Sequence, residues 1–566
     1  MNLVRGGTAS SPASLFAASE PGVWYNPSDL TTLFQDNAGT TPVTTPGQTV
    51  GLMLDKSQGL ALGAELVTNG DFSGGSTGWT VPAGWSITGG GAVAAVTNAS
   101  LLGGGVTPVS GLTYRVDFDV VSYTSGTLYI TVGGNFSGNP SLTGAAMAAG
   151  RKTVYVIAGA SPSRGVEFYG GSIAATIDNI SVKLLAGNHA TQATSAQRPT
   201  YGINPITGTR NLLTYTEQFD NAAWFLNLST LSVNSSTAPD GTLTVDKLIP
   251  NNAASGGYVV QNSSIISGQN YTFSFYGKPD GFSEVRTPDN GTFMGNNVNF
   301  NLSTGVATLI AGTATFGMTA AGNGWYRCFV SGTASATGSA SKQIRSLSTG
   351  DGTSGILIWG AQLEQSSTAT AYQKVVSQYE VTEAGVQSVS YLAFDGVDDG
   401  MITNTITPNI DKVQVFAGVR KLSDATVGVV AELSAVIDSN SGSFAVAAPA
   451  STATATYFFG SKGTVQAGTG TPASYAAPIS NVLTGIGDIS GSVATTRING
   501  NQVVQVGTSQ GTGNYLAYPL YIGRRGGTTL PFNGRLYSLV TRFGANLTTG
   551  QITSTESWVN SRTGAY

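Results

Sequence analysis

The sequence of 566 residues contains a single cysteine and a single histidine. One cysteine excludes an intrachain disulfide, and the position of Cys328 in the alternating apolar run GWYRCFVSG predicts a buried core residue. No carboxylate or nucleophile is placed near His189 in the sequence, so neither a metal site nor a Ser/His/Asp triad is indicated there. We therefore expect a structural role for His189.

Charged residues are also scarce, at 10% of the chain against roughly 25% in an average soluble domain. The net charge is −4 and no basic block occurs, so we expect no nucleic-acid partner. No stretch approaches the roughly 18 consecutive apolar residues of a membrane span, and the first residues lack the apolar region of a signal peptide. Neither a membrane span nor secretion through an N-terminal signal is expected.

Short alternating segments are what the sequence has in abundance, for example TYRVDFDVV, NYTFSFYGK, VQVFAGVRK and RLYSLVTRF. Every second residue in them is apolar or aromatic, which is typical of a strand with one solvent-facing side. Because Gly, Asn and Ser separate these segments, they predict β-sandwiches or jelly rolls. The expected fold class is all-β, with multiple β-sandwich or jelly-roll domains and one short helix of a turn or two within 547–564.

Two segments are variants of one pattern. The first, 65–80, reads ELVTNGDFSGGSTGWT, and the second, 211–225, reads NLLTYTEQFDNAAWF, so both lead through Phe to Trp. Each is followed by Ser-Gly-x-x-Tyr and a strongly alternating strand, in SGLTYRVDFDV and SGQNYTFSFYG. The repetition predicts two sandwich domains of one type.

These motifs resemble known families. NLLTYTEQFDNAAW, APDGTLTVDKL, YTFSFYGK, GNGWYRCFVSG and ILIWGAQLEQSSTATAYQ, which span 210–375, resemble a carbohydrate-binding-module-like sandwich of tailed-phage and prophage structural proteins. LVTNGDFSGGSTGWT and IDNISVKL are similar to the related sandwich of carbohydrate-binding modules. YLAFDGVDDGMI and YIGRRGGTTLPFNGRLYSLVTRFGANLTTGQI resemble a concanavalin A-like (laminin-G-like) jelly roll of the same class of phage proteins.

The resemblance also explains the polar stretch AGNHATQATSAQRPTYG at 186–202. In the resembled jelly rolls, a phrase like the one at 22–57 is followed by one like 187–201 and then by one like 391–399. The jelly roll is therefore interrupted twice, and insertion is tolerated at loop tips. The predicted parts are an N-terminal attachment arm (1–21), a discontinuous concanavalin A-like jelly roll (22–60, 187–206 and 385–566), and two inserted carbohydrate-binding-module-like sandwiches (62–186 and 208–380).

Few residues are candidates for a site, and no catalytic residue is indicated. Asp395, Asp398 and Asp399 lie close together in FDGVDDGM, and carboxylates so placed bind Ca²⁺ in some jelly rolls of the resembled family. The alternative is a β-turn whose Asp side chains bond their own backbone. The sandwich resemblance makes Trp79, Trp85 and Trp224 candidate glycan platforms, whereas Trp325 and Trp359 are expected in the core.

The function implied by the resemblance is a non-enzymatic structural or adhesion protein on the surface of a tailed-phage virion, as part of a tail, fibre or spike. Its expected partners are other virion proteins through the N-terminal arm, host-surface glycans, and further copies of the chain, with a trimer favoured. No cofactor besides Ca²⁺ is expected. One alternative is a capsid-surface decoration or head-fibre protein, and another is a secreted carbohydrate-active enzyme with binding modules.

Overall fold

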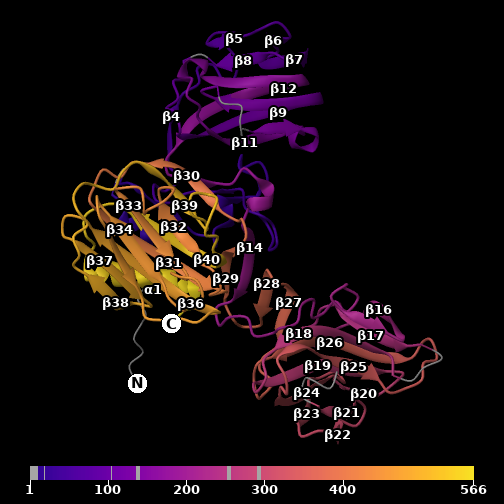
Figure 1. Ribbon diagram of the computed structural model, residues 1–566. Coiled ribbons are helices and arrows are strands. Elements are labelled where there is room, and N and C mark those ends of the chain that lie inside the picture. The colour runs from indigo at the N-terminus through magenta and orange to yellow at the C-terminus, as the bar shows by residue number, and fades with distance from the viewer. Residues whose placement is uncertain (1–10, 18–19, 104, 135–139, 252–255, 290–294) are drawn as a thin grey trace, which may run out of the picture. The chain divides into compact units, whose positions relative to one another are not determined.

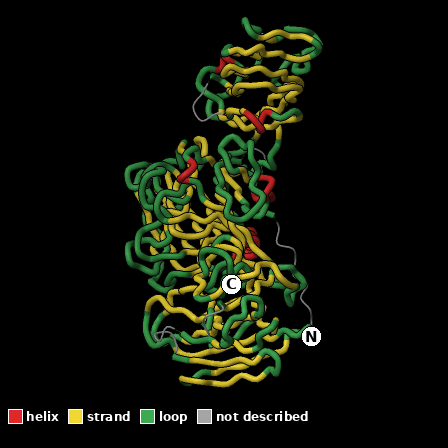
Figure 2. The backbone as a smooth tube through the Cα atoms, turned by 90° about the vertical axis from the view of Figure 1, so that its right-hand side faces the viewer, coloured by secondary structure: helices red, strands yellow, loops and turns green. Residues whose placement is uncertain are grey.

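The computed structural model describes residues 11–17, 20–103, 105–134, 140–251, 256–289 and 295–566. Strands and loops make up almost the whole trace in Figure 2, and the described α-helix is α1 (Thr549–Thr563). This confirms the predicted all-β class. None of the described helices combines the length and apolar character needed to cross a bilayer. The short 3-10 helices are η1 (Pro12–Leu15), η2 (Leu30–Thr32), η3 (Gly144–Met147), η4 (Pro162–Arg164) and η5 (Ser195–Gln197).

The chain divides into two compact units, one formed by 1–202 with 389–566 and the other by 203–388. The first unit contains both the jelly roll and the first inserted sandwich. The second unit contains the other sandwich, for which the sequence predicted the boundaries 208–380. The strand β14 (Thr200–Pro205) runs across the boundary between the two units.

Three separate parts of the chain contribute strands to the jelly roll of the first unit. Its first sheet includes, in spatial order, the neighbouring strands β29 (Ser388–Asp395), β40 (Asn533–Arg542), β31 (Lys412–Lys421), β36 (Ile479–Asp488), β37 (Val493–Ile498) and β38 (Asn501–Val506), with β1 (Gly22–Tyr25) also paired to β40. Its second sheet consists of β2 (Leu33–Phe34), β3 (Leu52–Met53), β13 (Ala190–Thr191), β30 (Met401–Ile406), β39 (Tyr518–Ile522), β32 (Val429–Leu433), β33 (Ser443–Ala447), β34 (Phe458–Lys462) and β35 (Gln466–Gly470). The discontinuous jelly roll of the predicted fold class is confirmed.

The polar stretch 186–202 supplies β13 to this jelly roll. Ala190 pairs with Thr403 of β30, far along the chain. His189 is buried, and its Nδ1 accepts the backbone N–H of Asp55 at 2.9 Å. Burial disfavours the charged imidazolium and lowers the pKa of His189 to about 4. The histidine therefore has the expected structural role.

The helix α1 is longer than the turn or two that the sequence predicts. Thr548 caps it in a reciprocal capping box with Gln551, and Gly564 ends it in the left-handed region with φ 61°. Trp558 is buried and meets the ring of Trp24 edge-on, with 5.7 Å between ring centroids. Tertiary packing of the side of α1 that carries Trp558 stabilises the additional turns of the helix.

The described part of the predicted N-terminal arm lies against its own chain. Leu15 at the end of η1 is buried, and Arg542 Nε donates to its carbonyl at 2.8 Å. Arg542 also pairs with Glu20 at 2.6 Å. The jelly roll of the same chain supplies these contacts, and attachment of the arm to another virion protein stays a prediction. Residues 1–10 and 18–19 of the arm lie outside the described residues.

The first sandwich is built around two long neighbouring strands, β9 and β12, which Figure 1 shows side by side. Register shifts along the pair bend the strands, one of them beside Gly126. A Cβ atom at Gly126, where φ is +88°, would lie 2.3 Å from the carbonyl oxygen of Ser172. The strands of this sandwich are β4 (Leu62–Glu65), β5 (Trp79–Thr80), β6 (Trp85–Thr88), β7 (Gly91–Thr97), β8 (Ser100–Gly103), β9 (Thr113–Val132), β10 (Ser141–Thr143), β11 (Gly150–Ile157) and β12 (Val166–Leu185).

The second sandwich has two six-stranded sheets around a core that contains the fully buried Cys328, as predicted. The first sheet consists of β15 (Phe225–Asn227), β18 (Tyr258–Ile265), β25 (Gly338–Ser346), β20 (Glu284–Arg286), β21 (Asn297–Asn301) and β22 (Val306–Ala311). The second consists of β16 (Ser229–Ser236), β17 (Val245–Pro250), β26 (Gly355–Glu364), β19 (Asn270–Asp280), β24 (Tyr326–Thr333) and β23 (Thr315–Ala320). The hairpin of β27 (Gln373–Ser377) and β28 (Glu380–Glu383) follows in the chain.

Candidate binding site

The second sheet of this second sandwich has a polar and aromatic outer face. Phe273 and Phe275 of β19 point into the core, so the alternation of the strand turns Ser274 and Tyr276 outward. On the neighbouring β24, Cys328 points inward and Arg327 outward by the same rule. The side chains on the outer face therefore do not contribute to the core between the two sheets.

A β-bulge at Gly360 places an aromatic side chain on this face. Trp359 lies outside the core, and Gly360, with φ +63°, takes up the extra residue so that Ala361 returns to the core. A Cβ atom at Gly360 would lie 3.0 Å from Cδ2 of Tyr276. Only glycine permits the close contact between this backbone and the tyrosine ring.

Three aromatic rings meet on the outer face. Trp359 contacts Tyr276 with 5.1 Å between centroids and Tyr372 with 4.9 Å, and the two tyrosines are 6.1 Å apart. The indole N–H of Trp359 donates to Oγ1 of Thr244 at 2.9 Å. The three rings line a cavity of about 560 Å³, in which Trp359 is buried and both tyrosines are half-buried.

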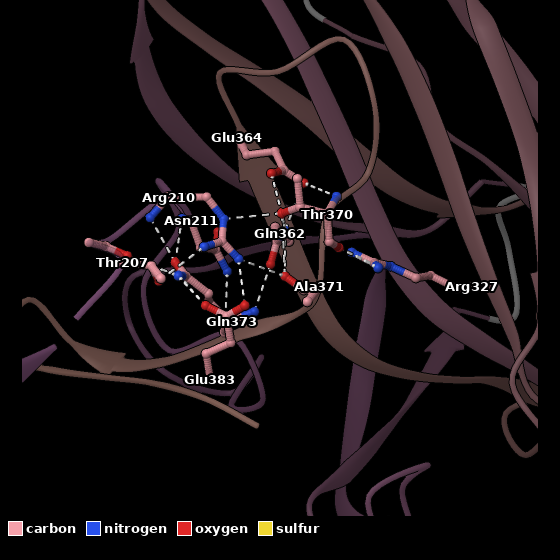
Figure 3. Close-up of polar contacts among 11 residues, drawn as sticks. Thr207, Arg210, Asn211, Arg327, Gln362, Glu364, Thr370, Ala371, Gln373 and Glu383 are labelled. Carbon is pink, nitrogen blue, oxygen red and sulfur yellow. Dashed lines mark hydrogen bonds and ion pairs between the residues drawn. The ribbon is translucent and has the colours of Figure 1, made fainter. Parts of the chain in front are cut away.

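Polar side chains hold the segment that carries Tyr372 against the sheet, as Figure 3 shows. Glu364 accepts both the backbone N–H of Thr370, at 2.9 Å, and its hydroxyl, at 2.6 Å. Gln362 accepts the backbone N–H of Gln373 at 2.8 Å, and Asn211 donates to the carbonyl of Gln373 at 3.0 Å. These polar side chains are all buried and hydrogen-bonded, so they fix the position of the Tyr372 ring.

Two ion pairs involve charged residues that line the cavity. Lys374 pairs with Glu217 at 2.7 Å, and Arg210 pairs with Glu383 at 2.8 Å. The hydroxyl of Tyr372 donates to Glu217 at 3.2 Å. Burial, followed by the nearby charge of Glu217, raises the pKa of Tyr372 well above its usual value. Tyr372 therefore stays a neutral hydroxyl at physiological pH.

Two further cavities adjoin the aromatic one and share lining residues with it. A cavity of about 310 Å³ shares Glu217 and Lys374, and one of about 430 Å³ shares Tyr276 and Arg327. Asp246, which lines the smaller cavity, accepts the backbone N–H of Phe219 at 2.9 Å. Burial raises its pKa to about 6. The three cavities are joined through these shared residues, and we call them together the outer groove.

The tryptophans proposed as sugar platforms from the sequence lie elsewhere. Trp79, Trp85 and Trp224 are 7%, 6% and 5% exposed and belong to the two sandwich cores. Each indole N–H donates to a backbone carbonyl of its own domain. A ring enclosed by core side chains presents no face to a sugar, which corrects the expectation for all three. Trp359 is buried, as expected, but it lies on the outer face of the sheet and not between the two sheets. The sequence signal that could have indicated this position is Gly360, the residue that follows it.

The structure brings Asp395, Asp398 and Asp399 together, with ligand oxygens within 4.8 Å of one another. Oδ1 of Asp395 accepts the backbone N–H groups of Val397 at 2.8 Å and Asp398 at 3.2 Å, which is the turn geometry of the alternative interpretation. Burial, then the charge of Asp395, raises the pKa of Asp399 to about 7. Ca²⁺ binding stays a prediction, to be checked by comparing thermal unfolding with and without Ca²⁺ in the wild type and Asp398→Asn.

Comparisons with known proteins give only distant likenesses. No protein family and no curated protein matches the sequence. The sialyllactose-bound CBM40 of the Ruminococcus gnavus IT-sialidase matches with a TM-score of 0.23 and 12% identity, over 26% of this chain and 84% of that one. A putative carbohydrate-binding protein from Bacteroides ovatus has a TM-score of 0.22 and 9% identity, over 54% and 80%. Mouse laminin α1 domains LG4-5 have a TM-score of 0.21 and 11% identity, over 48% and 82%. These likenesses are distant, and function is inferred below from this chain's own residues.

Proposed function

We propose that the protein binds glycans through the outer groove of the second sandwich. The observation that carries the proposal is the cavity of about 560 Å³ lined by the half-buried rings of Tyr276 and Tyr372, which pack on the buried Trp359, beside charged side chains. Apolar C–H faces of sugars pack against aromatic rings, while sugar hydroxyls need hydrogen-bond partners such as Glu217 and Lys374. A groove that combines both kinds of surface suits a saccharide better than a purely apolar ligand.

A single groove of this kind binds weakly, because each aromatic contact contributes only about 0.5–1.5 kcal/mol beyond its buried area. Several copies acting on one surface multiply the effective affinity without new contacts. Adhesion through avidity therefore fits the groove better than tight capture of one soluble sugar.

The proposal is tested with the full-length protein displayed on beads against a panel of bacterial surface glycans. Tyr276→Ala and Tyr372→Ala should each weaken binding of a positive glycan about five- to tenfold. Tyr258→Ala is the matched control, because Tyr258 is also half-buried and lies below an arginine, Arg345, at 5.9 Å, but on the other sheet. Equal losses in all three variants, or no glycan bound by the wild type, would overturn the proposal.

At a finer level, we propose that the protein is a non-enzymatic adhesion or structural component on the surface of a tailed-phage virion, part of a tail, fibre or spike. The sequence motifs shared with such proteins support this, as does the small charge of the chain, since assembly into a homo-oligomer, most simply a trimer, would cover exposed strand edges. Antibody labelling of purified particles distinguishes a tail location from capsid decoration or a head fibre. Release of reducing sugar from host polysaccharide by the purified protein would favour the secreted-enzyme alternative instead.

A further inference from the structure

The third cavity of the outer groove, of about 430 Å³, differs from the other two in the charge of its lining residues. Among the described residues that line this cavity, Arg327 is the charged one. The other lining side chains are small, hydroxyl-bearing or aromatic, and they are Tyr276, Thr315, Thr319, Ala320, Ala321, Phe329, Ser367, Thr368 and Ala369. A ligand in this cavity meets one positive charge surrounded by hydroxyl groups.

The guanidinium of Arg327 has N–H donors that make no hydrogen bond to the protein. One Nη donates to the carbonyl of Thr370 at 2.6 Å and the other to Oγ of Ser274 at 3.0 Å. Its Nε is enclosed but bonds to no partner, and no ion pair of Arg327 occurs among the described residues. Arginine carries five N–H donors, and because two make these bonds and the Nε–H is enclosed, two Nη–H donors are left for a ligand. By contrast, Arg210 in the same unit is neutralised by Glu383.

The side chain of Arg327 is also held in a fixed position. Its guanidinium lies over the ring of Tyr276, 5.6 Å from the centroid, and the two hydrogen bonds fix its plane. A fixed planar fork matches the two oxygens of a carboxylate, and charge-assisted bonds of this kind are about twice as strong as neutral ones. Thr315 and Thr319 line the same cavity, and threonine hydroxyls can bond to the hydroxyls of a sugar.

We propose, building on the proposed function, that this third cavity accepts a carboxylate-bearing sugar, a uronic or ulosonic acid residue of a longer glycan, whose carboxylate binds Arg327. The aromatic cavity, which shares Tyr276 and Arg327 with it, takes a neighbouring sugar of the same chain. The preferred ligand is therefore an acidic surface polysaccharide.

The test uses full-length protein with trigalacturonate and a trimer of sialic acid, each compared by calorimetry with its carboxyl-reduced form. The wild type should bind at least one acid about 10- to 100-fold more tightly than its reduced form, as expected for a hydrogen-bonded charge. Arg327→Gln should abolish this preference, so that the variant binds the acid and its reduced form with equal affinity. Arg345→Gln, the matched control on the other sheet, should retain the preference.

The outcomes separate this inference from the proposed function. Equal binding of acid and reduced sugar by the wild type, or a preference that survives in Arg327→Gln, overturns the carboxylate site and leaves glycan binding standing. Failure of both acids and both reduced forms to bind overturns both proposals. A sulfated neutral trimer is the third arm, and if it binds as tightly as the acids the cavity is a general anion site and carboxylate recognition is wrong. Arg327→Lys keeps the charge without the fork, and an intermediate preference supports the planar contact.

Discussion

The two inserted sandwiches have separate cores that are packed in the same way. In the first, Phe72 packs on Trp79 with 5.1 Å between centroids, and in the second, Phe219 packs on Trp224 at 4.8 Å. All four side chains are at most 7% exposed. The similar Phe-to-Trp pattern in the two sequences therefore reflects a common packing requirement.

The Ser-Gly-x-x-Tyr motif also has the same task in both domains. The hydroxyl of Tyr114 accepts the backbone N–H of Val109 at 2.8 Å, and the hydroxyl of Tyr271 accepts that of Ile266 at 3.0 Å. Each tyrosine lies at the start of the strand that crosses its core. The motif ties the turn to the strand that follows it.

The outer faces of the same strands differ. Asp119 follows Tyr114 at the spacing at which Tyr276 follows Tyr271, so a carboxylate stands where the second sandwich has an aromatic ring. In the first sandwich, Asp119 pairs with exposed Arg151 at 3.2 Å. Ion pairs give that face a hydrated surface, whereas the second sandwich has a groove. The fold constrains the inner face and leaves the outer face free to acquire function.

The largest expected effect tests this common packing of the two cores. Trp79→Ala and Trp224→Ala should each lower the free energy of unfolding by about 3–5 kcal/mol, because each leaves a cavity in a closed core. Urea unfolding followed by circular dichroism should show the loss in the unit that carries the substitution. A change below about 1 kcal/mol in either variant would mean that this tryptophan does not support its core.

A pH effect should distinguish the second sandwich. The pKa of Asp246 rises from its ordinary 3.8 to about 6 in the folded state, so the folded state binds the proton more tightly. Its contribution to stability is greatest below pH 4, falls by roughly 3 kcal/mol at most as the pH rises to 6, and is constant above that. Urea unfolding at pH 4 and pH 7 should show a smaller loss in Asp246→Asn than in the wild type. An equal loss would contradict the assignment to Asp246.

The tyrosine hydroxyls should have an intermediate effect. Tyr114→Phe and Tyr271→Phe each leave a backbone N–H without its acceptor, which should cost about 1–3 kcal/mol of unfolding free energy. Because the motif is the same, the two losses should agree within about 1 kcal/mol. A loss in one variant alone would show that the two turns are not equivalent.

The smallest effect is expected on the outer face of the first sandwich. Asp119→Asn breaks an exposed pair with Arg151 and should change stability by less than about 1 kcal/mol, with a smaller effect in high salt. Glycan binding by the full-length protein should be unchanged. If binding falls as far as in Tyr276→Ala, the first sandwich also takes part in recognition, and the contrast between the two outer faces is wrong.

Much of the fold could be predicted from the sequence because alternation and turn residues are local signals. Alternating apolar residues marked the strands, and Cys328 was correctly placed in a core. The site was not predicted, because a period of two distinguishes the faces of a strand without showing which face another segment covers. Trp224 and Trp359 are both buried tryptophans, yet Trp224 belongs to a core and Trp359 lines a groove.

The sequence by itself determined the all-β class and the repeated sandwich, since both depend on patterns within short segments, whereas the interruption of the jelly roll was implied by its resemblance to a known family. Only the tertiary structure brought together the residues of the proposed binding site. Tyr372 reaches Tyr276 because hydrogen bonds from Asn211 and Glu364 hold its segment across the sheet. These contacts join residues distant in sequence, and their stability depends on burial and exact geometry, which no local pattern records.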